Sequence, residues 1–161
     1  MRAELFTIDR PGAGRLSTMT KPGGGEGLAI EMSALAAAGI TVLVSLLTDG
    51  EMAEAGLTGE AEAAAAAGLE FLRLPTPDQT VPNQQAALAI AGMLRSRLAA
   101  GGGVAVHCYA GIGRCSTLAA AVLVMEGMPA ADAWTRLTAA RGVPVPDNPA
   151  QRAFVDGLPA A

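Results

Sequence analysis

Residues 40–47 form a largely apolar run rich in β-branched side chains, and residues 104–107 are a second stretch typical of a buried strand. A strand of this kind buries both of its faces, so it belongs in the middle of a parallel sheet that helices cover on both sides. Strand-like and helix-like segments alternate four times along the chain with short connections. The sequence therefore predicts an α/β fold, with a single mostly parallel sheet of about four to five strands flanked by helices.

The remaining segments complete this fold. Residues 5–8 and 15–19 are two short strand-like runs around a turn, which predicts a short N-terminal hairpin at a sheet edge. A further strand is expected over 69–74. Helices are expected over 26–38, over 50–67 as two short helices broken by Gly56, over 81–100 with Pro82 in the first turn, over 118–126 in a helix that begins near Arg114, and over 129–140 and 148–158.

Composition narrows the class of protein. A chain of 161 residues with 51% hydrophobic side chains is expected to form one domain, residues 1–161, with a core that needs no disulfide or metal. The longest uncharged apolar run, 118–125, is far shorter than the roughly 18 residues of a membrane span. Charged residues near the start leave no apolar core for a signal peptide, so we expect a cytoplasmic protein. A net charge of -4 argues against a nucleic-acid partner.

Residues 49–70 carry six acidic side chains and no basic one. We interpret this stretch as a solvent-exposed face of the two short helices, which is the usual role of a run of like charges. The alternative is an acidic docking surface for another molecule.

Ligands of open α/β sheets bind beyond the carboxyl ends of the strands, so the loops after Leu47, Leu74 and His107 are the candidate sites. The third loop stands out. The only histidine, the only tyrosine and both cysteines of the chain fall within the nine residues 107–115, whose sequence is His-Cys-Tyr-Ala-Gly-Ile-Gly-Arg-Cys. The reactive side chains of an otherwise alanine-rich chain are therefore concentrated in one strand-to-helix connection.

A glycine-containing loop between a strand and a helix can form an anion-binding cradle from inward-facing backbone N–H groups and the positive end of the helix. Gly111 and Gly113 allow unusual backbone angles and close approach. Arg114 offers two parallel donors for a tetrahedral oxyanion. Cys108 lies at the start of this cradle, so we expect its pKa to be lowered and the side chain to be a thiolate at neutral pH.

The pattern His107-Cys108, five residues and Arg114 resembles the active-site loop of the cysteine-dependent protein tyrosine and dual-specificity phosphatases. The chain is most similar to their small kinase-associated dual-specificity branch. The resemblance implies a cysteine-phosphatase-like fold and a cysteinyl-phosphate intermediate, with Cys108 as nucleophile and Arg114 as phosphate clamp. It also implies a supporting role for His107, which hydrogen-bonds near the nucleophile and tunes its pKa. Residues Tyr109, Ala110, Gly111, Ile112 and Gly113 would surround the phosphate.

The leaving group of such a reaction needs a proton, so a carboxylic acid should reach the loop from elsewhere. Asp78 follows a predicted strand in a Pro-Asp segment comparable to that of the family's general acid, and it could also take a proton from the hydrolytic water. An ordinary loop residue or a helix cap near Pro82 is the alternative role for Asp78, and Asp49 is the reserve candidate. The resemblance suggests that Gln151 positions the water; an exposed helical glutamine is the alternative.

Cys115 departs from the family pattern, which places Ser or Thr after the arginine to hydrogen-bond the thiolate. Either turnover is slowed or Ser116 partly takes over that role. We hypothesise that Cys115 forms a reversible disulfide with Cys108; the alternative is a small residue packed behind the loop.

Because of Cys115, a phosphate-binding module that has lost turnover and a redox-regulated phosphatase-like protein are alternative functions. Arsenate reduction and sulfur transfer use a similar loop without an acid placed like Asp78.

The expected partner is a phosphorylated protein or peptide, and phosphate or sulfate is expected to occupy the loop. Residues 109–113 contain no Lys or His, which disfavours highly charged inositol polyphosphates and phosphoinositides. Phosphotyrosine, alone or together with phosphoserine and phosphothreonine, fits better. A single histidine cannot form a metal cluster, so neither metal nor cofactor is expected. The sequence does not indicate an oligomeric state.

Overall fold

The computed structural model of the chain describes residues 4–159. Its centre is a five-stranded sheet in the order β1-β2-β5-β3-β4. The strands are β1 Phe6–Thr7, β2 Arg15–Met19, β3 Val42–Ser45, β4 Glu70–Arg73 and β5 Gly103–His107. All neighbouring strands are parallel except β1, which pairs with β2 in the antiparallel N-terminal hairpin. The predicted fold class, the strand number and the edge hairpin are confirmed.

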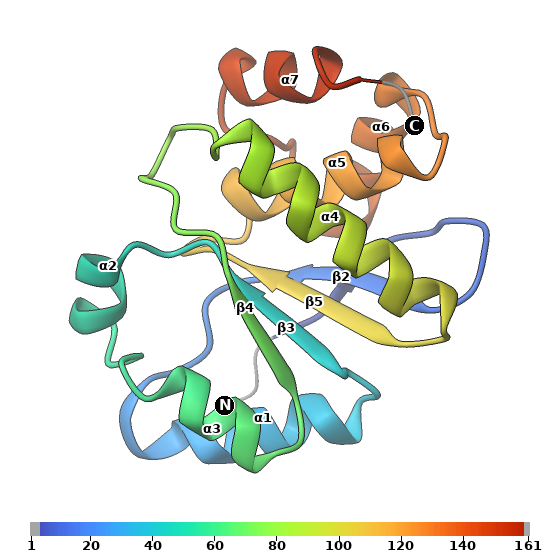
Figure 1. Ribbon diagram of the computed structural model, residues 1–161. Coiled ribbons are helices and arrows are strands. Elements are labelled where there is room, and N and C mark those ends of the chain that lie inside the picture. The colour runs from blue at the N-terminus through green and yellow to red at the C-terminus, as the bar shows by residue number, and fades with distance from the viewer. Residues whose placement is uncertain (1–3, 160–161) are drawn as a thin grey trace.

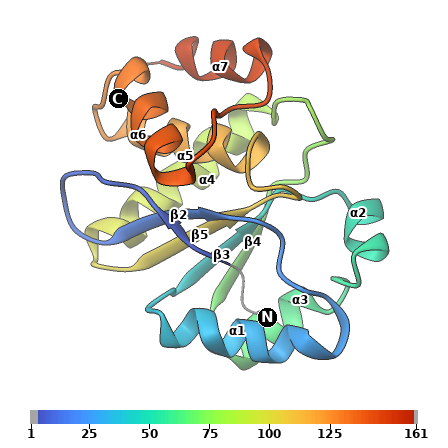
Figure 2. The same ribbon diagram turned by 180° about the vertical axis from the view of Figure 1, so that it is seen from behind.

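Helices cover both faces of the sheet (Figures 1 and 2). One face carries α4 Gln84–Ala99, α5 Arg114–Met125, α6 Ala130–Arg141 and α7 Pro149–Asp156. The other carries α1 Leu28–Ala37, which follows a 3-10 turn at Gly25–Gly27, and α3 Glu60–Ala66. The short helix α2 Asp49–Glu54 lies beside the loop end of the sheet. Within residues 4–159, no helix combines the length and apolar character needed to cross a bilayer.

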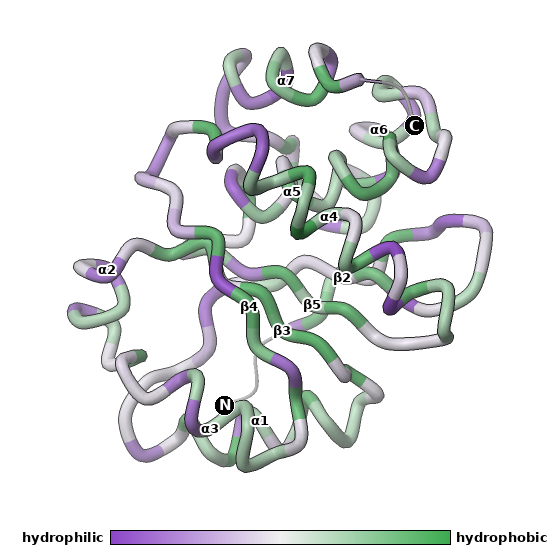
Figure 3. Tube along the Cα trace, in the orientation of Figure 1, coloured by the Kyte–Doolittle hydropathy of each residue, from purple (hydrophilic) through white to green (hydrophobic). Residues whose placement is uncertain are grey.

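The central strands separate two apolar cores by the alternation of their side chains. On β3 and β5, Val42, Val44, Val104 and Val106 pack toward α4 to α7, whereas Leu43, Ala105 and their neighbours pack toward α1 and α3. The hydropathy colouring of Figure 3 shows the middle of each of these two strands as apolar. Burying a Val or Leu side chain contributes about 1.5–3 kcal/mol, so the apolar runs specify the middle of the sheet.

The start of α4 differs from the prediction. Asn83 is the N-cap, and its side-chain Oδ1 accepts a hydrogen bond from Ala86 N at 2.9 Å. The helix proper begins at Gln84, so Pro82 lies before the cap and not in the first turn. An asparagine cap satisfies a free N–H at the helix start, which proline cannot do.

Candidate active site

The loops that follow β3, β4 and β5 meet at one end of the sheet, at the left in Figure 1. Cys108 follows β5 directly, and α5 begins at Arg114, so residues 108–113 form the whole connection. The predicted loop is therefore bounded by the two elements that an anion cradle needs, a strand end and a helix N-terminus.

Cys108 is buried at the base of this loop, with 2% of its surface exposed. The S–H of Cys115 donates a hydrogen bond to its sulfur, and the backbone N–H groups of Cys115 and Gly111 do the same. These hydrogen bonds, with a smaller contribution from the positive charge of Arg114, outweigh the effect of burial and lower the pKa of Cys108 from 9.0 to about 6. The thiol is consequently a thiolate at neutral pH.

Cys115, the residue that departs from the family pattern, is thus the main hydrogen-bond partner of the Cys108 thiolate. Burial raises the pKa of Cys115 well above 9.0, so this thiol keeps its proton and remains a donor. The hydroxyl of Ser116 is also buried, and it acts on Cys115, whose pKa it lowers slightly against the effect of burial; it is not among the groups that lower the pKa of Cys108. Ser116 therefore does not replace the donor that the family places after the arginine; Cys115 itself provides it.

The two loop glycines are required for different reasons. Gly111 has a φ of +73°, a conformation that other residues rarely adopt, as expected. Gly113 has an ordinary φ of -92° and ψ of -72°, so the prediction of unusual angles there is wrong. The predicted close approach is confirmed, because a Cβ at Gly113 would collide with the carboxylate of Asp147 and lie 2.9 Å from Gln151 Nε2.

Two basic residues outside the loop contact it, Arg141 through its guanidinium and Lys21 through its backbone N–H and its side chain. Arg141 donates from Nε to Gly111 O at 2.9 Å and from Nη2 to Ala110 O at 3.3 Å. Lys21 donates its backbone N–H to Tyr109 O at 3.2 Å, and its Nζ lies 5.2 Å from the centroid of the Tyr109 ring, which is 45% exposed. The loop carbonyls are thereby occupied, and positive charge lies beside the loop although residues 109–113 contain none.

Arg114 is buried, with 1% of its side chain exposed. Glu51 accepts from its Nη1 at 2.7 Å and from its Nη2 at 2.9 Å, and Thr76 O accepts from Nη1 at 2.8 Å. The hydrogen bonds from Arg114 lower the pKa of Glu51 below its usual range. A guanidinium has five N–H donors, so Nε–H and one Nη2–H stay available as a second parallel pair.

The acidic stretch 49–70 is therefore not simply a solvated face, and for two of its residues that interpretation is wrong. Glu51 binds Arg114, and Glu60 is completely buried. Glu60 Oε2 lies 2.5 Å from Nε2 of His107, which is equally buried, and His107 Nδ1 lies 3.2 Å from Cys108 O. A buried carboxylate needs such a partner. The His107 imidazole thus supports the loop backbone. The groups that lower the pKa of Cys108 most are Cys115 and the backbone N–H of Gly111.

Asp78 lies at the open side of the site. Its Oδ1 is 3.3 Å from Arg114 Nη2, and 61% of its side chain is exposed. The same oxygen accepts a hydrogen bond from Gln79 N, whose φ of 65° is the one positive value at a non-glycine residue within 4–159. The alternative role as helix cap is wrong because Asn83 caps α4. The reserve candidate Asp49 pairs instead with Arg73 at 2.6 Å.

Gln151 is buried beside the loop, so the alternative of an exposed helical glutamine is wrong. Its Oε1 accepts from Asp147 N at 2.9 Å, and its Nε2 donates to Thr80 O at 3.3 Å. Asn148 Nδ2 donates to Gln79 O at 3.0 Å. The start of α7 thus anchors the loop that carries Asp78. Sequence reasoning missed Asp147, Glu51 and Glu60 as site residues; only the acidity of 49–70 hinted at two of them.

A family profile described as Tc-R-P, polymorphic toxin system, DSP-PTPase phosphatase, matches residues 17–128. The matched region includes the whole 107–115 loop, Asp78 and both anchoring glutamates. The chain belongs to this phosphatase family. It is a member of the cysteine-dependent tyrosine and dual-specificity phosphatases, as its loop predicts.

Solved phosphatase structures have the same fold. The kinase associated phosphatase, in a form whose catalytic-site cysteine is substituted by serine, superposes with a TM-score of 0.87 at 18% identity, over 96% of this chain and 93% of that one. Tk-PTP in its active form gives 0.75 at 24% identity, over 96% and 93%. PTPMT1 in complex with PI(5)P gives 0.74 at 20% identity, over 87% and 86%. A search of curated proteins gave no match.

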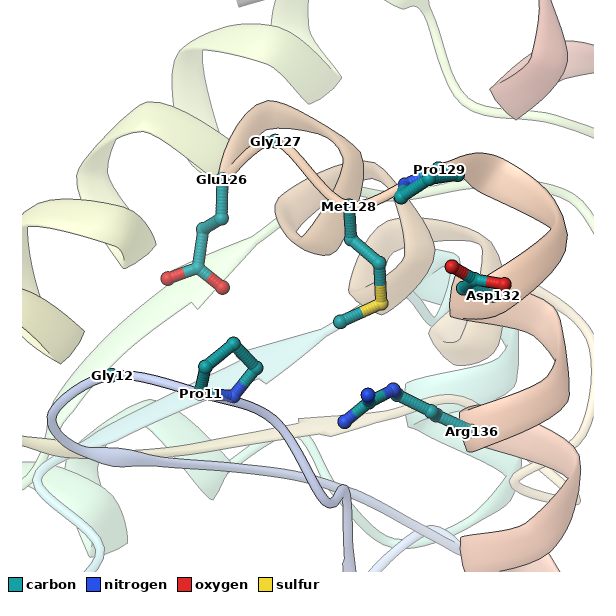
Figure 4. A pocket seen from close by; sticks show the side chains of 8 residues that line it. All are labelled: Pro11, Gly12, Glu126, Gly127, Met128, Pro129, Asp132 and Arg136. Atoms are coloured by element: carbon teal, nitrogen blue, oxygen red, sulfur yellow. The ribbon is translucent and has the colours of Figure 1, made fainter.

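This phosphatase also has a pocket of about 520 Å³ away from the loop (Figure 4). It lies between the β1–β2 turn, the α5–α6 connection and α6, and Met128, Asp132 and Arg136 line it. Two of its charged side chains already have partners, because Glu126 binds Arg10 at 2.6 Å and Arg136 donates to Asp9 O at 2.8 Å. None of the predicted site residues reaches this pocket.

Proposed function

We propose that this protein hydrolyses phosphate monoesters of protein side chains through a cysteinyl-phosphate. The observation that carries the proposal is the environment of Cys108, a thiol with a pKa of about 6 at the base of a strand-to-helix loop. A stable thiolate aimed at an anion cradle is a nucleophile for phosphorus.

In the first step, the Cys108 sulfur attacks phosphorus, the phosphorus–oxygen bond to the side chain breaks, and the leaving oxygen takes a proton. Asp78 is the proposed donor of that proton, since it lies 3.3 Å from the Arg114 guanidinium at the open side of the loop. Arg114 binds the phosphoryl oxygens through Nε–H and the remaining Nη2–H, while Glu51 holds the opposite edge of the guanidinium.

In the second step, water attacks phosphorus, the phosphorus–sulfur bond breaks, and the sulfur leaves as a thiolate. The proton of the water passes to a carboxylate of the site; Asp78, which has just lost a proton, is the acceptor implied by the family resemblance. The S–H of Cys115 stabilises the departing thiolate by the hydrogen bond that it already makes to it. Product phosphate then leaves the loop.

We propose phosphotyrosine as substrate, alone or together with phosphoserine and phosphothreonine. The exposed Tyr109 ring beside the loop supports contact with an aromatic side chain. Residues 109–113 contain no cation, which disfavours polyanionic substrates. However, Lys21 and Arg141 contact the loop from outside and bring positive charge to it. Phosphoinositides therefore belong in the substrate panel.

The test is a steady-state assay of the wild-type protein on phosphotyrosine, phosphothreonine and phosphoinositide substrates across pH. We expect phosphate release from phosphotyrosine peptides and none from the Cys108→Ser variant. A folded wild type that binds inorganic phosphate but releases none from any substrate would support the rival function, a phosphate-binding module without turnover.

The hydrogen bond between the two cysteines also supports the redox-regulated alternative. A peroxide would oxidise the Cys108 thiolate to a sulfenic acid, and the Cys115 sulfur would displace its hydroxyl as water, which forms the disulfide. Intact mass after mild peroxide should fall by two protons in the wild type and not in Cys115→Ser. No such mass loss in the wild type, or the same loss in Cys115→Ser, would exclude the disulfide.

A further inference from the structure

The carboxylate of Asp147 lies directly over the phosphate-binding loop, where sequence reasoning assigned no function. It fills the space above Gly113 that a side chain at that position would need. The backbone of Asp147 is held there, because its N–H donates to Gln151 Oε1 at 2.9 Å, while Gln151 N donates to Asn148 Oδ1 at 3.0 Å. The start of α7 therefore places a carboxyl group at the loop as firmly as the strand places the cysteine.

Two carboxyl groups thus face the same loop in different surroundings. Asp78 is largely exposed and lies next to Arg114. Asp147 is also solvent-exposed, but partial burial together with the negative charge of Asp78 raises its pKa, against the opposing effect of Arg114. Neighbouring carboxyls with different surroundings commonly divide acid and base roles between them.

Gln151, the residue expected to position the hydrolytic water, already uses its amide oxygen and one of its two N–H donors to hold the protein. Its Oε1 accepts from Asp147 N, and its Nε2 donates to Thr80 O. By contrast, the side-chain oxygens of Asp147 take part in none of the hydrogen bonds or ion pairs formed within residues 4–159. Asp147 accordingly offers two free acceptor oxygens beside Gly113, whereas Gln151 keeps only one N–H donor and cannot accept the proton of a water molecule.

We propose that Asp147 is a second catalytic carboxyl group, which accepts the proton of the water that hydrolyses the cysteinyl-phosphate. The inference rests on the proposed function and divides between two carboxyls the two proton transfers that the family resemblance gives to Asp78. Asp78 protonates the leaving oxygen in the first step. In the second step the water oxygen bonds to phosphorus, the sulfur of Cys108 leaves with its electron pair, and the water proton moves to Asp147.

The test is pre-steady-state kinetics with p-nitrophenyl phosphate, whose good leaving group makes the first step fast. Asp147→Asn should give a burst of about one nitrophenol per active site, followed by a kcat at least about tenfold below wild type, as for loss of a base. Because kcat/KM reports only the first step, it should stay unchanged. Acid quenching should trap the phosphorylated protein, visible by intact mass.

Three further variants make the result specific. Asp147→Glu, which keeps a carboxyl, should recover most of kcat, and thermal unfolding of each variant shows whether the fold is intact. Asp156→Asn removes an exposed carboxyl from the end of the same helix and should behave as wild type. Asp78→Asn should lower kcat/KM on phenyl phosphate, whose poor leaving group needs an acid, and should give no burst.

An unchanged kcat in a folded Asp147→Asn protein, or a fall in kcat/KM without a burst, would overturn the role of Asp147 and leave the proposed function intact. A wild type that releases no nitrophenol would instead overturn the proposed function itself.

Discussion

The loop 107–115 and the four carboxylates around it form one site in opposite ways. The loop is a single stretch of chain, and its main contacts to the Cys108 sulfur come from its own Gly111 and Cys115. The carboxylates, Glu51, Glu60, Asp78 and Asp147, come from four separate segments, two on the α2–α3 side and two from the loops before α4 and α7. The proposed nucleophile therefore depends on local chain geometry, whereas the proposed acid–base groups depend on tertiary packing.

The carboxylates themselves divide into two pairs. Glu51 and Glu60 bind Arg114 and His107, so their charges are used inside the protein to hold two loop residues. Asp78 and Asp147 lie at the open side of the loop, where a substrate or water can reach them. A carboxylate thus anchors the loop when it is buried against a cation, and the two that face the open side are the ones we propose as proton carriers.

The largest effect should come from the local part of the site. Cys108→Ser removes the thiolate, and a serine hydroxyl in the same place has a far higher pKa, so phosphate release from aryl phosphates should be abolished. Cys115→Ser is the matched control, since it changes the other cysteine and keeps a hydrogen-bond donor. Full activity of Cys108→Ser in a phosphate-release assay would exclude this residue as nucleophile.

The next largest effect on activity should come from a substitution at Asp78, on the open side of the loop. Asp78→Ala removes the proposed acid, so kcat/KM for phenyl phosphate should fall by roughly a hundredfold or more, as is typical of a lost general acid. Asp49→Ala, the reserve candidate that pairs with Arg73, is the control and should retain most activity. Equal losses in the two variants would contradict the assignment of Asp78.

Substitution of a carboxylate that anchors the loop should change the free energy of unfolding more than the activity. Glu60→Gln replaces a charge-assisted hydrogen bond to the buried His107 by a neutral one, which should lower the free energy of unfolding by about 1–3 kcal/mol. Glu62→Gln changes an exposed residue of the same helix and should stay within about 0.5 kcal/mol of wild type. Urea unfolding at neutral pH measures both, and indistinguishable values would contradict an anchoring role.

The smallest change concerns the pKa of the nucleophile. The rate of Cys108 alkylation by iodoacetamide should rise with pH through a midpoint near 6, because only the thiolate reacts. Cys115→Ala removes the main hydrogen-bond donor, so the midpoint should move to higher pH, while the hydroxyl of Cys115→Ser should keep it low. A midpoint that does not move in Cys115→Ala would show that the backbone and Arg114 suffice.

Periodicity predicted the sheet correctly because its information is local. The apolar runs at 40–47 and 104–107 became β3 and β5, each with side chains in both cores. The error at Pro82 was also local, since Asn83 was a better cap one residue later. The acidic stretch 49–70 was misjudged for a different reason: charge runs are usually solvated, and nothing in the stretch itself shows that His107 and Arg114 will lie opposite two of its glutamates.

The sequence by itself determined the phosphate-binding loop, the thiolate within it and the parallel sheet that presents it, because strand, glycine turn and helix start follow one another in the chain. It also singled out Asp78 through its Pro-Asp setting. Tertiary structure alone decided that Glu51 and Glu60 anchor the loop, that Gly113 is needed for space, and that Asp147 faces the site. These contacts join residues that lie 34 to 63 positions apart in the sequence. Only the packing of helices on the sheet brings such residues together.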